Sequence, residues 1–279
     1  MSAVPDTLGI IAGNGRYPFL LAREAREAGV RRLVAAAFEK ETDPALAREV
    51  DEIAWLRVGQ LGKLCKYFGG RGVPAAIMAG QIAPGNLFDL RPDLKALIVL
   101  ATLKERNAES IFGAIADELA KAGTELLPAT TFMERHLAPE GHFAGPEPAR
   151  RVREDVAFGY RIAKETSRLD IGQTVVVKKG TVLAVEAFEG TDEAARRGGK
   201  LGRGGAVLVK VSKPNQDFRF DVPVFGPRTL ESARDSGIAV LACEANKTLL
   251  LEDDTLRERA AAWKISLVGI EPAAEDKTL

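Results

Sequence analysis

Near its start the chain carries Leu8-Gly9-Ile10-Ile11-Ala12-Gly13-Asn14-Gly15, a short apolar run that ends in a glycine turn. A continuous apolar run of this length is typical of a strand that is buried on both faces of a parallel sheet. Residues 17–28 then have the spacing of a helix, which Gly29 ends. A buried strand, a glycine turn and a helix together favour the first unit of a Rossmann-like domain.

The alternation of strand and helix signals continues over the first 130 residues. Further strands are expected at residues 33–38, 53–58, 75–79 and 125–128, and helices at 61–68, 94–103 and 110–122. Strands that alternate with helices predict a mostly parallel sheet with flanking helices. We therefore expect a Rossmann-like domain over residues 1–130.

A second α/β domain, with a mixed sheet, is expected over residues 149–279. Residues 131–148 separate the two domains; they lose periodicity and carry several prolines and glycines, which is typical of a linker. The second domain opens with a helix near 152–166. A hairpin that turns at Lys179-Gly180 follows, and then short strands and helices.

The composition argues against several classes of protein. Lys plus Arg and Asp plus Glu number 39 each among 279 residues, so no basic field indicates a nucleic-acid partner. No apolar run is long enough to cross a bilayer, and the N-terminus lacks the features of a secretion signal. The two cysteines, Cys65 and Cys243, stand in apolar contexts without metal-ligand spacing, which favours buried thiols in a reducing compartment. We expect a cytoplasmic protein.

The second half contains a charged stretch, Lys213-Pro214-Asn215-Gln216-Asp217-Phe218-Arg219-Phe220-Asp221-Val222-Pro223. As an extended strand it would place Asp217, Arg219 and Asp221 on one face and apolar side chains on the other, because side chains alternate along a strand. Carboxylates bind Mg²⁺, while Arg and Lys bind phosphate. The pattern favours phosphate-ester or phosphoanhydride chemistry; a structural ladder of ion pairs is the alternative.

Other charged segments of the second domain could complete such a site. Glu189-Gly190-Thr191-Asp192 forms a turn after a strand, and Lys210 precedes Lys213 at the end of another strand. Like charges at strand ends repel unless a metal or a phosphate neutralises them. Thr191 could instead be a helix N-cap, and Lys210 a charge that protects an edge strand.

The first domain allows a different interpretation. Gly13 and Gln81 follow strand ends, where open α/β sheets bind ligands. The glycine turn precedes a helix N-terminus, which favours an anion, and Glu39 stands where an acid could bind a ribose. Pro18 replaces the third glycine of the dinucleotide fingerprint. A nicotinamide-dependent oxidoreductase is therefore an alternative.

In their order along the chain, several segments resemble the UDP-2,3-diacylglucosamine pyrophosphatases of bacterial lipid A biosynthesis, of the type distinct from the calcineurin-like phosphoesterase version. These segments are residues 8–13, 78–81, 137–141, 170–173 and 184–192, and the long charged stretch 213–223 with Gly226 and Thr229. The sequence departs from the usual pattern at Asn14 and at residues 104–108.

The resemblance implies a Mg²⁺-dependent hydrolase of two α/β domains with the ligand held between them. Its substrate would be UDP-2,3-diacylglucosamine, cleaved to UMP and 2,3-diacylglucosamine 1-phosphate (lipid X) by water that attacks the phosphorus nearer the sugar. A lipid-like substrate implies transient contact with the inner membrane surface. A homodimer is left open, as is a non-catalytic module that binds a UDP-sugar or a lipid.

On this hypothesis, Asp221 is the residue that binds the metal or orients the water. The catalytic residues would be Asp221, Asp217 and Arg219, so residues 149–279 would be the catalytic domain. The ligands of Mg²⁺ would be Asp221, Asp217 and Asp192. The substrate-binding residues would be Gly13, Gln81, Glu189, Thr191, Lys210, Lys213 and Gln216.

Overall fold

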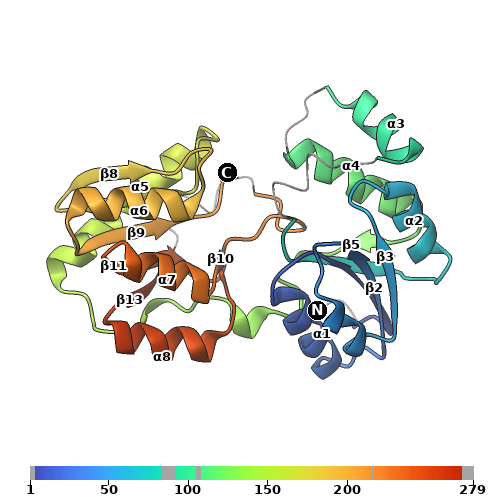
Figure 1. Cartoon of the computed structure of the whole chain (residues 1–279), viewed down its shortest axis with the longest axis horizontal. Coiled ribbons are helices and arrows are strands. Elements are labelled where there is room, and N and C mark those ends of the chain that lie inside the picture. Colours follow the sequence, from blue (N-terminus) through green and yellow to red (C-terminus); the bar gives the residue numbers. More distant parts are fainter. Residues whose placement is uncertain (1–3, 83–91, 105–107, 215, 272–279) are drawn as a thin grey trace. The chain divides into compact units, whose positions relative to one another are not determined.

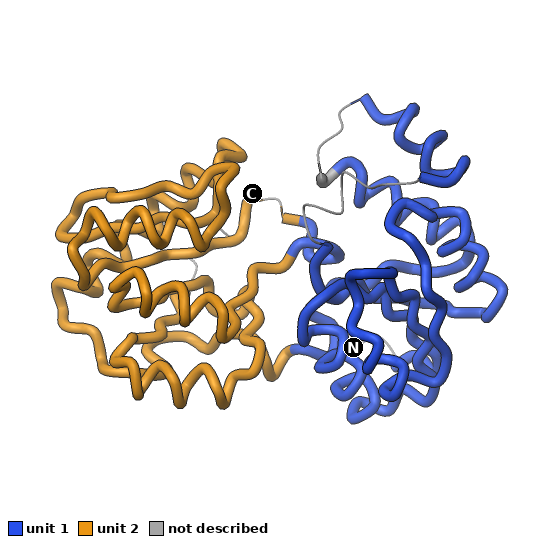
Figure 2. The backbone as a smooth tube through the Cα atoms, viewed as in Figure 1, with its two compact units in different colours: residues 1–133, 217–221 blue, residues 134–216, 222–279 orange. Residues whose placement is uncertain are grey.

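The computed structural model describes residues 4–82, 92–104, 108–214 and 216–271. The chain divides into two compact units (Figure 2). The N-terminal unit comprises Met1–Met133 and Asp217–Asp221, and the C-terminal unit comprises Glu134–Gln216 and Val222–Leu279. Both units are α/β, as predicted (Figure 1).

Within the described ranges, the N-terminal unit contains a five-stranded sheet in the order β3-β2-β1-β4-β5, with parallel pairing throughout. Its strands are β1 (Thr7–Ala12), β2 (Arg32–Phe38), β3 (Glu52–Leu56), β4 (Ala75–Ala79) and β5 (Glu125–Leu126). Its helices are α1 (Tyr17–Glu27), η1 (Pro44–Arg48), α2 (Leu61–Gly69), α3 (Leu94–Thr102) and α4 (Ala108–Lys121). The Rossmann-like prediction is confirmed, and β1 and β2 are buried almost throughout because both of their faces are covered.

The C-terminal unit contains a mixed six-stranded sheet, β6-β13-β11-β9-β7-β8, and a two-stranded sheet, β10-β12, in its described part. The strands are β6 (Gly141–Ala144), β7 (Thr174–Lys178), β8 (Thr181–Val185), β9 (Ala206–Lys210), β10 (Val224–Phe225), β11 (Ile238–Glu244), β12 (Leu249–Leu250) and β13 (Ser266–Ile270). The helices are η3 (Glu134–His136), α5 (Arg150–Arg168), α6 (Thr191–Gly202), α7 (Pro227–Asp235) and α8 (Asp253–Trp263).

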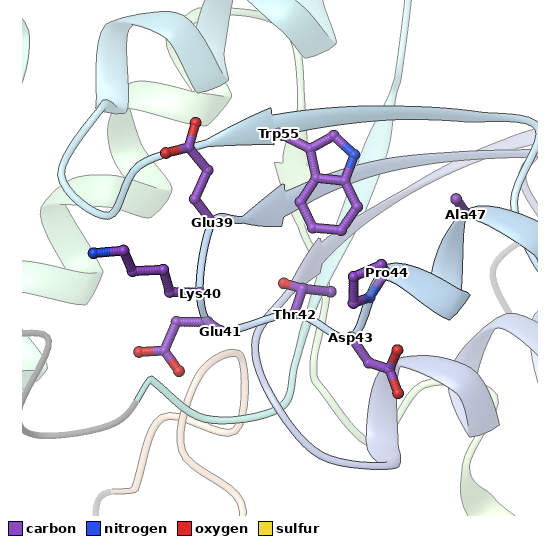
Figure 3. Close-up of a pocket in the computed structure, with 8 residues that line it drawn as sticks. All are labelled: Glu39, Lys40, Glu41, Thr42, Asp43, Pro44, Ala47 and Trp55. Carbon is purple, nitrogen blue, oxygen red and sulfur yellow. The ribbon is translucent and has the colours of Figure 1, made fainter.

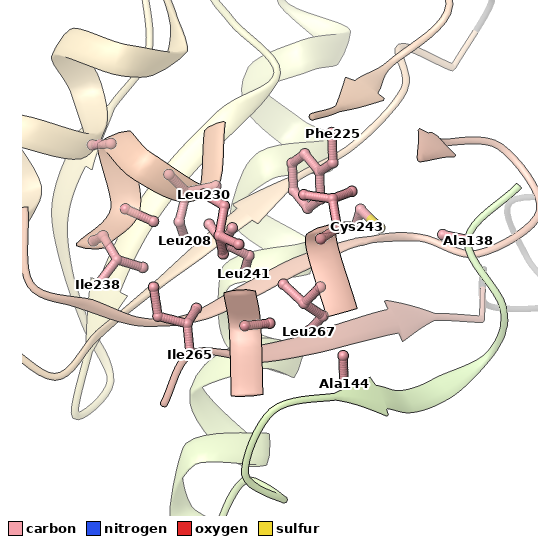
Figure 4. Close-up of a cluster of buried hydrophobic side chains, with 14 of the residues drawn as sticks. Ala138, Ala144, Leu208, Phe225, Leu230, Ile238, Leu241, Cys243, Ile265 and Leu267 are labelled. Atoms are coloured by element: carbon pink, nitrogen blue, oxygen red, sulfur yellow. The ribbon is translucent and has the colours of Figure 1, made fainter. Parts of the chain in front are cut away.

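The two faces of the larger sheet pack on different helices. Leu208, Leu241 and Leu267 are buried in a cluster that includes residues of α6, α7 and α8 (Figure 4). Val175 and Val209 are buried against α5 on the other side. Both faces of the sheet are thus covered by apolar side chains. A polar site is therefore expected at the ends of the strands.

The predicted linker, residues 131–148, differs from the structure. It contains η3 and β6, and β6 pairs antiparallel with β13 in the sheet of the C-terminal unit. A four-residue strand between turns is too short to show an alternating pattern, which explains why the sequence indicates only a linker.

Helix α6 was not predicted, because its glycines are poor helix formers. The structure shows why they are there. A Cβ atom on Gly198 would lie 2.4 Å from the Val176 side chain, and one on Gly199 would lie 1.9 Å from the Ser236 carbonyl oxygen. Gly198 lets α6 approach the sheet closely, and Gly199 lets it approach the end of α7, so packing outweighs local propensity.

The prediction of a strand over residues 213–223 is wrong, because local hydrogen bonds replace strand pairing. Asp217 accepts at its side chain from the Arg219 N–H at 3.0 Å, and its carbonyl oxygen accepts from the N–H of Asp221 at 3.1 Å. The turn also packs on its own unit: the Phe220 ring lies 5.2 Å from that of Phe112 on α4, centroid to centroid. Side chains therefore do not alternate between two faces here.

Candidate functional site

The C-terminal unit gathers polar side chains at the edge of its sheet where β8, β9 and β11 end and β7 begins. Lys210 lies opposite Thr174 in the pairing of β9 with β7. The Thr191 hydroxyl, at the start of α6, donates to Glu186 at 2.9 Å and accepts from Lys210 Nζ at 3.4 Å. The two threonine hydroxyls are 3.3 Å apart. The structure thus brings the predicted residues Thr191 and Lys210 together.

Two helices begin at this edge, which favours an anion. Gly190, not Thr191, is the N-cap of α6; its φ is 85° and no side chain caps the helix. Asp192 in the first turn of α6 pairs with Arg228 in the first turn of α7 at 3.2 Å. The helix N-termini and the cations Lys210 and Arg228 suit a phosphate, whereas Asp192, which pairs with Arg228, and Glu193 add negative charge to the first turn of α6.

Glu186 was missed as a site residue, although it lies in the quoted segment 184–192. One of its oxygens, Oε2, is buried and has no hydrogen-bond partner among the described residues. A buried, unpaired carboxylate oxygen is unfavourable unless a donor or a cation reaches it. The position of Glu186 directly after β8 was the signal in the sequence.

A buried glutamate fixes the chain next to this edge. Glu244, at the end of β11, is fully buried and accepts from the N–H and hydroxyl of Ser212 and from Lys164 Nζ at 3.2 Å. Burial raises the pKa of Glu244, but the bonds from Ser212 and the charges of Lys164 and Lys247 outweigh it and hold the pKa below its usual range. Glu244 is therefore ionised at neutral pH and fixes Ser212, the residue before Lys213.

Three other residues of the C-terminal unit that were predicted to bind substrate contact protein groups instead. Lys213 pairs with Asp170, and Glu189 pairs with Arg197 at 2.6 Å. The Gln216 Oε1 accepts from the N–H of Lys213 at 2.6 Å. Exposed ion pairs contribute little to stability, so Lys213 and Glu189 can exchange these partners for a ligand at small cost.

In the N-terminal unit, a backbone hydrogen bond joins the segments that follow β1 and β4, where the strand order reverses. The N–H of Asn14 donates to the Gln81 carbonyl at 2.7 Å. A Cβ atom on Gly13 would lie 2.5 Å from that same oxygen. Glycine at position 13 is thus required by packing, and substrate binding by Gly13 and Gln81 stays a prediction.

Asp217, Arg219 and Asp221, which were predicted within the C-terminal domain, belong instead to the N-terminal unit. Arg219 Nε lies 3.0 and 3.1 Å from the two carboxylate oxygens of Asp217, and Nη2 lies 2.6 Å from Oδ2. These bonds from Arg219 hold the pKa of Asp217 below its usual range. The Asp217 carboxylate is therefore ionised and holds the Arg219 guanidinium in place.

The predicted Mg²⁺ ligands are divided between the units, with Asp217 and Asp221 in one and Asp192 in the other. Among the described residues, no three His, Cys, Asp or Glu side chains are grouped so that they could hold a metal ion. Both oxygens of Asp217 already accept from Arg219, so Asp217 fits a metal poorly. Coordination by Asp192 and Asp221 stays a prediction.

A pocket of about 730 Å³ lies beside β2 and β3 in the N-terminal unit (Figure 3). It is lined by Glu39, Lys40, Glu41, Thr42, Asp43, Pro44, Ala47 and Trp55. Glu39, which the oxidoreductase alternative needs for a ribose, pairs with Arg57 at 3.2 Å. None of the residues predicted for the pyrophosphatase site lines this pocket.

Two family models match the chain, the LpxI N-terminal domain over residues 7–136 and the LpxI C-terminal domain over residues 139–268. The UDP-2,3-diacylglucosamine pyrophosphatase LpxI of Caulobacter vibrioides is 32% identical over 276 residues, which cover 95% of this chain and 98% of that protein. The biotin carboxylase domain of Hydrogenobacter thermophilus 2-oxoglutarate carboxylase has a TM-score of only 0.26 at 16% identity. That alignment covers 63% of this chain and 35% of the carboxylase chain, and the likeness is too low to inform either fold or chemistry. The agreement of both domain models with a relative that spans nearly the whole chain shows that this protein belongs to the LpxI family of UDP-2,3-diacylglucosamine pyrophosphatases.

Proposed function

We propose that this chain hydrolyses the pyrophosphate bond of UDP-2,3-diacylglucosamine and releases UMP and lipid X. The observation that carries the proposal is the 32% identity to a UDP-2,3-diacylglucosamine pyrophosphatase over 95% of the chain. The polar edge of the C-terminal unit supports it, because two helix N-termini and two cations suit a pyrophosphate.

In the proposed reaction, water attacks the phosphorus nearer the glucosamine. The bond from that phosphorus to the bridging oxygen breaks. The bridging oxygen leaves with UMP, and the oxygen of the water stays on lipid X. Asp221 orients the water. Lys210 and the first-turn amides of α6 neutralise the phosphates, and Arg219, held by Asp217, stabilises charge that develops during the reaction.

The assay that tests this function combines the purified protein, UDP-2,3-diacylglucosamine and Mg²⁺ and measures UMP. Release of UMP with equimolar lipid X is the expected result. Tight binding of the nucleotide sugar without UMP would favour the non-catalytic module instead. Binding of NADH, followed by its fluorescence, would favour the oxidoreductase.

Mg²⁺ is proposed as the metal, because a divalent cation neutralises a pyrophosphate and suits carboxylate ligands. In the N-terminal unit its proposed ligand is Asp221; in the C-terminal unit Asp192 is proposed, and the unpaired Oε2 of Glu186 is a further candidate. We expect EDTA to abolish release of UMP and excess Mg²⁺ to restore it. EDTA saturated with Mg²⁺ is the control, and full activity in free EDTA would refute the metal requirement.

We also propose transient contact with the inner membrane surface, because the substrate carries two acyl chains. Within the described ranges, no helix has the length and apolar character that a membrane span needs. A homodimer and a cytoplasmic location stay predictions from the sequence.

A further inference from the structure

Helix α3 of the N-terminal unit presents an uncovered apolar face. The exposed fractions of Leu94, Leu97 and Ile98 are 73%, 50% and 56%. Ala101 is exposed as well. These positions are spaced i, i+3, i+4 and i+7, so they share one face of the helix. Three large aliphatic side chains gathered in this way are uncommon on a soluble surface.

The fold does not need this face, because α3 packs through its other side. Ala96 is buried there, and Val99 packs against the cluster that contains Leu64 and Leu119. A helix that is apolar all round is normally buried on all sides. With nine residues, α3 is far too short to span a bilayer. The outer face of α3 is therefore available to bind an apolar surface that is not part of the N-terminal unit.

The size and the charges of the face indicate an anionic lipid surface. Three aliphatic side chains on two turns expose far less than the roughly 800 Å² per partner that a stable protein interface buries. Exposed lysines stand at both ends of α3. Lys104 follows its C-terminus. At its N-terminus, the N-cap residue Asp93 accepts at its side chain from the N–H of Lys63 at 3.3 Å. Apolar side chains flanked by lysines suit a bilayer that contains acidic phospholipid.

We propose that α3 docks this enzyme on an anionic bilayer, with Leu94, Leu97 and Ile98 in the interfacial region. That the bilayer holds the diacylated substrate rests on the proposed function, but the docking itself does not. Contact through a short helix face is weak, and it lets the enzyme leave the membrane after each encounter.

The test is cosedimentation of the full chain with vesicles of phosphatidylethanolamine and phosphatidylglycerol. We expect the double variant Leu97→Gln/Ile98→Gln to lower the vesicle partition coefficient at least about tenfold, since each substitution removes apolar contact with the lipid. The matched control is Leu201→Gln, because Leu201 is an exposed leucine that lies on α6 rather than on α3. This variant should bind vesicles as the wild type does. Circular dichroism checks that each variant is folded.

Three results of the vesicle assay would overturn the docking: no binding by the wild type, equal binding by the double variant, or equal binding to vesicles without acidic lipid. Loss of a dimer on size exclusion by the double variant would also overturn it, in favour of a second copy. Release of UMP from detergent-dispersed substrate should be the same for wild type and double variant. Vesicle binding without any release of UMP would refute the proposed function and leave the docking intact.

Discussion

Asparagine in place of Asp221 is expected to lower the rate of UMP release at least about a hundredfold, or about 2.7 kcal/mol in the activation barrier. The substitution keeps the size of the side chain but removes the charge that would bind Mg²⁺ or orient the water. The turn itself should persist, because its backbone bond from Asp221 to Asp217 does not involve the carboxylate. Steady-state release of UMP under saturating Mg²⁺ is the measurement.

The matched control is Asp235→Asn, on the exposed end of α7, where the carboxylate pairs with Arg234. Its rate should stay within about twofold of the wild type, because exposed pairs matter little. A rate for Asp221→Asn within about tenfold of the wild type would remove Asp221 from the mechanism.

Alanine in place of Glu244 is expected to lower the free energy of unfolding by about 3 kcal/mol. The change leaves the nearly buried ammonium of Lys164 without its carboxylate and the Ser212 N–H without its acceptor. Urea unfolding followed by circular dichroism measures the loss. Glu231→Ala is the control: this half-exposed glutamate pairs with Arg259, and its removal should cost at most about 1 kcal/mol. Equal losses for the two variants would contradict the role of Glu244.

The effect of Glu244 should depend on pH in a fixed direction. Its pKa is lowered in the folded protein, so the unfolded chain takes up the proton first as the pH falls. Its stabilisation is then fully present above the unfolded pKa of about 4.3 and is lost as the pH falls through the lower, folded pKa. The difference between wild type and Glu244→Ala should therefore shrink below about pH 4.

The N-terminal sheet could be predicted because its signals are local. Each strand from β1 to β4 is a short apolar run that ends near a glycine or a turn, and helices follow β1, β3 and β4. Helix α6 could not be predicted, since its glycines are explained only by contacts with Val176 and Ser236. A period of two does not hold over the stretch 213–223, because bonds of the Asp217 side chain and carbonyl to nearby N–H groups form turns there.

The candidate site was predictable only in part. Thr191 and Lys210, predicted from two separate segments to share one site, lie within hydrogen-bond distance of each other, and their binding of substrate stays a prediction. Glu244 was missed because nothing near it in sequence indicates its partner Ser212, 32 residues away, which two parallel strands bring beside it. Contacts of this kind depend on strand order, which single segments of sequence do not specify.

The return of residues 217–221 to the N-terminal unit makes that unit discontinuous in sequence. A nascent chain cannot complete it until residue 221 has left the ribosome, when most of the C-terminal unit has already been synthesised. A chimera that exchanges residues 134–279 between two relatives also exchanges the turn that bonds Ala129 and stacks on Phe112. We therefore expect such a chimera to disturb the N-terminal unit as well as the C-terminal one.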